Sequence, residues 1–136
     1  LPESMSNLTW RGNTSSFTWI NNNRFYFIEE AAVYLYDLTD NTLIKANEFD
    51  RDGKNVTIDT KNLHVAFTVK NNLFVAVDGT TIQATDEKNE DIVYGQVPSR
   101  NEFGINEGMY WSPDGNRLAF YRTDTKTGKT ECITAG

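Results

Sequence analysis

The stretch that decides the fold is GMYWSPDGNRLAFYR, residues 108–122. One apolar run ends at Trp111, a polar segment follows, and a second apolar run starts at Leu118. Within the polar segment, Pro113 presets φ for the first turn position, and Gly115 can adopt the positive φ that other residues resist. The stretch therefore predicts two antiparallel strands joined by a short polar loop.

The same pattern, an apolar anchor followed by a strand-like tripeptide, recurs along the chain. Ile58 precedes the VAF of residues 65–67 by the interval that separates Trp111 from the LAF of residues 118–120. Residues 19–27 fit the pattern with one residue fewer. Aromatic and β-branched residues fill the runs, Asn and Asp fill the gaps, and no long window shows a helical period.

These repeats divide the chain into units at about residues 16–46, 55–85 and 108–136, with an insertion at about 86–107. A repeat of about 40 residues that forms a four-strand meander is typical of propeller blades. We therefore predict one all-β domain over residues 1–136, a β-propeller-like array of about three four-stranded antiparallel meanders. A β-sandwich or barrel of similar short strands is the alternative.

Composition excludes several classes of protein. The chain has 136 residues, which is enough for one modest domain with a core. No run approaches the roughly 18 apolar residues of a membrane span. The formal net charge of −6 argues against a nucleic-acid partner, because phosphate binding requires clustered Lys and Arg.

The residues that carry metal and thiol chemistry are scarce. One His and one Cys cannot make a structural zinc site. Residues 50–55 hint at a calcium loop, but Lys61 stands where the closing Glu belongs. We therefore predict no metal and no cofactor. The lone Cys132 rules out an internal disulfide, and we expect it to be a small buried residue near the chain end.

Catalytic signals are also missing. The sequence contains no Gly-x-Ser-x-Gly elbow, and no serine stands out as a nucleophile. His64 alternates with apolar residues, so we expect a strand-surface or packed histidine rather than a general base. We therefore expect no hydrolysis by this chain.

Three stretches suggest a family. Residues 92–94 (IVY), 100–105 (RNEFGI) and 110–115 (YWSPDG) resemble the N-terminal propeller domain of the dipeptidyl peptidase IV family, especially its Bacteroidetes-type members. The likeness is specific from Ile92 to Arg122 and is limited to the blade pattern elsewhere.

This resemblance implies candidate binding residues. In full-length relatives the propeller covers an α/β-hydrolase domain, and glutamates of a blade insertion hold the free amino terminus of the substrate. Glu102 matches that acidic motif by position, although Asn101 replaces the adjacent glutamate of the family pattern. Arg100 and Glu107 lie nearby and are further candidates. A solvated carboxylate that braces its loop is the alternative interpretation of Glu102.

Three functions are compatible with this sequence. The first is a non-catalytic binding or interaction module. The alternative is a fragment of a longer serine exopeptidase, in which Glu102 anchors the amino terminus of the substrate. The third is a structural β-domain of a cell-envelope assembly. Expected partners are a peptide, a peptidase catalytic domain, or a second copy that pairs with open sheet edges. The resemblance implies an exported protein of the periplasm or cell envelope.

Overall fold

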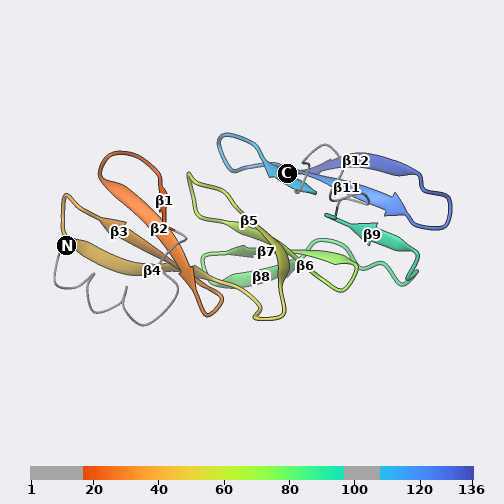
Figure 1. Cartoon of the computed structure of the whole chain (residues 1–136), viewed down its shortest axis with the longest axis horizontal. Coiled ribbons are helices and arrows are strands. Elements are labelled where there is room, and N and C mark those ends of the chain that lie inside the picture. Colours follow the sequence, from red (N-terminus) through yellow and green to blue (C-terminus); the bar gives the residue numbers. More distant parts are fainter. Residues whose placement is uncertain (1–16, 97–107) are drawn as a thin grey trace.

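The computed structural model describes residues 17–96 and 108–136, which form three four-stranded sheets. The first sheet contains β1 (Thr18–Trp19), β2 (Arg24–Glu29), β3 (Ala32–Asp37) and β4 (Thr42–Glu48). The second contains β5 (Lys54–Ile58), β6 (Val65–Val69), β7 (Asn72–Val77) and β8 (Thr80–Gln83). The third contains β9 (Ile92–Tyr94), β10 (Met109–Trp111), β11 (Leu118–Asp124) and β12 (Thr130–Ala135). The sheets follow one another in a row along the long axis (Figure 1).

The all-β prediction is confirmed. The first two sheets are antiparallel meanders in chain order, and the three sheets share no strand. This arrangement is propeller-like and differs from a sandwich or a closed barrel. The described residues contain no helix, and therefore no helix that could cross a membrane.

The sequence repeat corresponds to one structural position. Trp19 pairs with Phe25, Ile58 with Val65, and Trp111 with Leu118. Each pair closes the loop of one hairpin, formed by β1 and β2, by β5 and β6, and by β10 and β11. Backbone hydrogen bonds close the loops at equivalent places, from Asp59 N to His64 O at 2.9 Å and from Ser112 N to Arg117 O at 2.8 Å. The anchors therefore mark the loop ends of equivalent hairpins.

The third sheet is not a simple meander. Residues 92–94 were predicted to lie in the insertion, but they form β9 and pair with residues 122–124 of β11. Met109–Trp111 pair with residues 118–120 of the same strand, so β9 and β10 occupy successive parts of one edge. This is feasible because β11 is 7 residues long and β10 covers only three of them.

The middle sheet is buried on both faces. Four of the five residues of β6 are buried, because alternate side chains face the first and the third sheet. The cluster toward the first sheet has Val33, Leu63, Val65, Phe67 and Ala76. The cluster toward the third sheet has Ala66, Leu73, Met109, Leu118 and Phe120. The middle sheet therefore packs through one apolar layer on each face, and a third buried cluster, of Phe25, Phe27 and Tyr36, lies within the first sheet.

Cys132 differs from its expected environment. The prediction of a buried thiol is wrong, because Cys132 lies exposed on β12. In the described part of the chain β12 pairs only with β11, and most of its residues are exposed. The burial of Cys132 could not be predicted, because the sequence does not show which strand lies at the edge of a sheet.

Candidate functional site

The three residues proposed to bind substrate, Arg100, Glu102 and Glu107, lie outside the described residues. The structure does show where their segment starts and ends. A Cβ on Gly108 would overlap the carbonyl group of Gly95, so the two glycines are in close contact. Gly108 leads directly into β10 at Met109. The described chain on the two sides of residues 97–107 therefore meets beside the third sheet.

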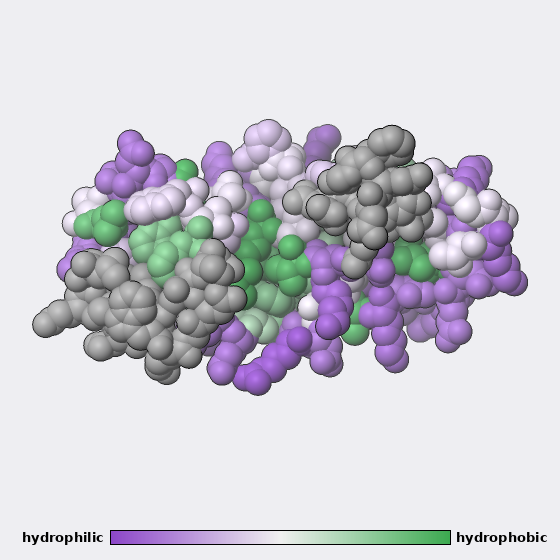
Figure 2. Space-filling view, viewed as in Figure 1, coloured by the Kyte–Doolittle hydropathy of each residue, from purple (hydrophilic) through white to green (hydrophobic). Residues whose placement is uncertain are grey.

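A groove of about 550 Å³ lies where β1, β2, β5 and β10 converge. Its walls come from β1, β2, β5, β10 and the loop that follows each of the last two. The lining residues are Thr18, Tyr26, Ile28, Val56, Thr57, Ile58, Asp59, Thr60, Met109, Tyr110, Trp111, Ser112 and Pro113. Figure 2 shows hydrophobic residues gathered on the visible face where the first and second sheets adjoin.

Two edge strands form adjacent parts of this groove. In the described sheets β5 pairs only with β6, and β10 pairs only with β11 at these positions. Trp111 Nε1 joins the two strands by donating a hydrogen bond to Thr57 O at 3.0 Å. Val56 and Tyr110 keep 36% and 41% of their surface exposed. The groove thus combines apolar side chains with two edge strands that are joined to each other through Trp111.

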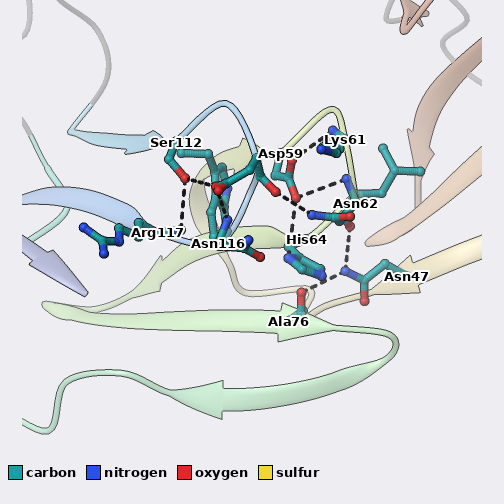
Figure 3. Close-up of polar contacts among 12 residues, drawn as sticks. Asn47, Asp59, Lys61, Asn62, His64, Ala76, Ser112, Asn116 and Arg117 are labelled. Atoms are coloured by element: carbon teal, nitrogen blue, oxygen red, sulfur yellow. Dashed lines mark hydrogen bonds and ion pairs between the residues drawn. The ribbon is translucent and has the colours of Figure 1, made fainter. Parts of the chain in front are cut away.

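A buried carboxylate supports the loop after β5. Only 2% of the Asp59 side chain is exposed. Its Oδ1 accepts a hydrogen bond from Lys61 N at 2.9 Å, and its Oδ2 accepts one from Asn62 N at 3.2 Å. His64 Nδ1 lies 3.4 Å from Oδ2, and the His64 ring packs against Trp111 with centroids 5.9 Å apart. Figure 3 shows these side chains together. Asp59 therefore holds its own loop in a fixed shape.

The loop after β10 is held by a second carboxylate. Ser112 Oγ donates to Asp114 Oδ1 at 2.7 Å, and the same carboxylate oxygen accepts from Asn116 N at 2.9 Å (Figure 3). The Ser112 bond, followed by the Asn116 bond, holds the pKa of Asp114 below its ordinary value. Ser112 Oγ also accepts a hydrogen bond from Arg117 N at 3.0 Å. The polar residues of this loop therefore satisfy one another.

These bonds define what the site can do chemically. The Ser112 hydroxyl donates to Asp114 rather than to His64, so the His64–Asp59 pair does not activate this serine. No group of three or more His, Cys, Asp or Glu side chains among residues 17–96 and 108–136 could hold a metal.

The expectation for His64 is accurate in part. Its ring is packed, with 20% of the side chain exposed, but β6 begins one residue later at Val65. The role of Asp59 was missed, although Asp59 directly precedes the turn-forming polar residues 60–62. An Asp immediately before such a turn is the available signal, since Asp side chains commonly accept bonds from turn backbone.

Comparisons with known proteins place these features in a family. The family model for the dipeptidyl peptidase IV N-terminal region matches residues 5–130. A crystal structure assigned as a dipeptidyl aminopeptidase IV from Bacteroides ovatus is similar, with TM-score 0.67 and 30% identity. That match covers 87% of this chain and 18% of the Bacteroides protein.

A second similar structure is dipeptidyl peptidase 4 of Porphyromonas gingivalis, with TM-score 0.51 and 28% identity, over 82% of this chain and 16% of that protein. The chain therefore spans less than a fifth of the length of either protein. The family match covers most of the sequence, including the hairpin at residues 108–122 with which the repeat was recognised. The chain belongs to the dipeptidyl peptidase IV N-terminal region family.

Proposed function

We propose that this chain is a non-catalytic binding module whose ligand is an extended peptide. The peptide would lie in the groove formed by β1, β2, β5 and β10. The observation that carries the proposal is the groove itself, about 550 Å³ in volume and bordered by two edge strands. This volume lies within the range of small-ligand sites, about 300–1,000 Å³. An extended peptide can add to an open strand edge through backbone hydrogen bonds, while apolar pockets accept alternate side chains.

Charge also favours a particular ligand. Among the described residues that line the groove, Asp59 alone is charged, and the whole chain has a formal net charge of −6. An acidic peptide would be repelled by this field, whereas a neutral or basic peptide would not. We therefore propose that the module prefers peptides without acidic side chains.

Blocking the groove tests this proposal. Val56→Trp should fill the groove from β5 and weaken binding of a labelled neutral hexapeptide, measured by fluorescence anisotropy. Ile82→Trp is the matched control, because Ile82 is 53% exposed on β8 and does not line the groove. Equal affinities of the two variants would exclude the groove as the binding site.

A second candidate function is supported by the comparisons. The chain matches an N-terminal region and covers only 18% and 16% of two peptidase structures. We propose that it acts as the substrate-gating part of a longer serine exopeptidase, with Glu102 binding the ammonium group of the substrate. Gly95 and Gly108, which lie on either side of residues 97–107, are in close contact, and Gly108 immediately precedes the groove-lining residue Met109.

Paired peptides test the role of Glu102. Glu102→Gln should weaken binding of a peptide with a free amino terminus by about tenfold, the loss of roughly 1.4 kcal/mol. The acetylated form of the same peptide should bind both proteins equally. Glu90→Gln, an exposed carboxylate of the described chain, is the control. Equal losses with both peptides would remove Glu102 from the proposal, and Arg100 and Glu107 would be tested in the same way.

Partners and location follow from the same proposals. The catalytic partner would be a serine peptidase domain, and added domain should co-purify with the chain. The open edge of β12 would otherwise pair with a second copy, which light scattering at rising concentration would detect. We further propose an exported protein of the periplasm or envelope, which cell fractionation would test.

A further inference from the structure

The loop after β10 packs directly on the loop after β5. A Cβ on Gly115 would overlap the carboxylate of Asp59 and would lie 2.6 Å from Asn62 Nδ2. Gly115 also has φ +72, a conformation that is strained for other residues. Both the space and the backbone at this point therefore require glycine.

The surface that Gly115 meets is rigid. The Asp59 carboxylate is nearly fully buried and is oriented by two backbone N–H groups of its own loop. A neighbour that is tied down in this way cannot move aside as the free end of a flexible side chain would. The third sheet therefore contacts the second at a point that tolerates little displacement.

Two hydrogen bonds between the sheets accompany this contact. Asn62 Nδ2 donates to Asp114 O at 2.9 Å, and Trp111 Nε1 donates to Thr57 O at 3.0 Å. Both bonds join the strand and loop of residues 54–62 to those of residues 109–116. Hydrogen bonds depend strongly on distance and angle, so together they fix the relative position of β5 and β10.

The same residues border the groove. Asp59, Trp111 and Pro113 all line it, so a displacement at the contact would also displace two of the walls. We propose that Asp59, Asn62 and the loop around Gly115 form a latch between the second and third sheets that sets the width of the peptide groove. The effect of the latch on binding rests on the proposed function, whereas the joining of the sheets does not.

Glycine substitutions test the latch. Gly115→Ala introduces both backbone strain and the overlap with Asp59. Gly128→Ala introduces similar backbone strain, at φ +77, but no heavy atom lies within 4 Å of its added Cβ. Hydrogen exchange of the full chain should be about tenfold faster in β5 and β10 of Gly115→Ala than in the control. Equal exchange in the two variants would overturn the latch.

A further variant keeps the test decisive. If Gly115→Ala does not fold, Asn62→Ala removes the bond to Asp114 O and should still accelerate exchange in β10. Unchanged exchange in Asn62→Ala would then overturn the proposal.

A binding measurement separates the latch from the proposed function. The labelled neutral hexapeptide should bind Gly115→Ala about tenfold more weakly than Gly128→Ala. If the unmodified chain binds no such peptide, the proposed function fails while the exchange measurements still decide whether the latch exists. If the peptide binds both variants equally, the latch does not set the width of the groove.

Discussion

The two interfaces of the middle sheet are fixed in different ways. Toward the first sheet, the buried amide of Asn47 donates to Leu63 O and Ala76 O, both at 2.8 Å, and accepts from Gly79 N at 2.8 Å. Toward the third sheet, no single buried side chain does this work in the described residues. The contact there combines loop against loop, at Gly115 and Asn62, with the bond from Trp111 Nε1 on β10 to Thr57 O on β5.

The polar contacts at both interfaces nevertheless lie at the same end of the middle sheet. The Asn47 amide reaches the β5–β6 and β7–β8 loops, and the third sheet reaches the β5–β6 loop through the neighbouring residue Asn62 (Figure 3). The apolar layers supply area for burial, but they are non-directional. We infer that directional hydrogen bonds specify how neighbouring sheets are placed. These bonds are buried between the first and second sheets, whereas the Asn62 bond between the second and third sheets is exposed.

The largest expected effect is at the first interface. Asn47→Ala removes the side-chain partner of two carbonyl groups and two N–H groups, so the free energy of unfolding should fall by about 3 kcal/mol. Urea unfolding measures the loss. Asn22→Ala, at an exposed turn position between β1 and β2, should change stability by less than about 0.5 kcal/mol. Similar values for the two variants would show that Asn47 does not fix this interface.

A smaller effect is expected at the second interface. Trp111→Phe retains an aromatic ring but removes the bond to Thr57 O, which should cost about 1 kcal/mol in urea unfolding. Trp19→Phe serves as the comparison, because Trp19 is 58% exposed on β1. If Trp19→Phe is the more destabilising substitution, the Trp111 bond does not contribute to the joining of the sheets.

The smallest effect concerns the loop that carries the latch. Ser112→Ala removes the main cause of the lowered pKa of Asp114, so this pKa should rise toward its ordinary value, as followed by carboxyl NMR. A lowered pKa stabilises the folded chain at pH values above the ordinary pKa of the group. This stabilisation is lost as the pH falls through the pKa of the folded state. The variant should therefore lose less stability on acidification. An unchanged pKa, as expected for the exposed-site control Thr39→Ala, would contradict this account.

Local patterns predicted much of the fold. Anchors, turn residues and β-branched runs were sufficient to identify the hairpins and their equivalence, because turn chemistry and strand pairing involve nearby residues. Strand β9 was missed because three residues carry little periodicity and their partner is β11, much later in the chain.

The polar contacts between sheets could not be predicted in the same way. Asn47 bonds to residues 16 and 29 positions away, and Asn62 bonds to one 52 positions away. Nothing around either residue indicates these partners, since an Asn in a strand end or turn is equally suited to solvent. The groove likewise arises only when strands from all three sheets converge, and these strands are far apart in the sequence. The binding residues suggested by resemblance, Arg100, Glu102 and Glu107, remain predictions.

The close contact of Gly95 with Gly108 has a consequence for how this domain can diversify. Because Gly95 and Gly108 are in contact beside β11, the described residues themselves hold β9 and β10 in place along that strand. Doubling the length of a flexible connection costs only about 0.6 kcal/mol of closure entropy. We therefore expect chain inserted between Gly95 and Gly108 to leave the three sheets unchanged.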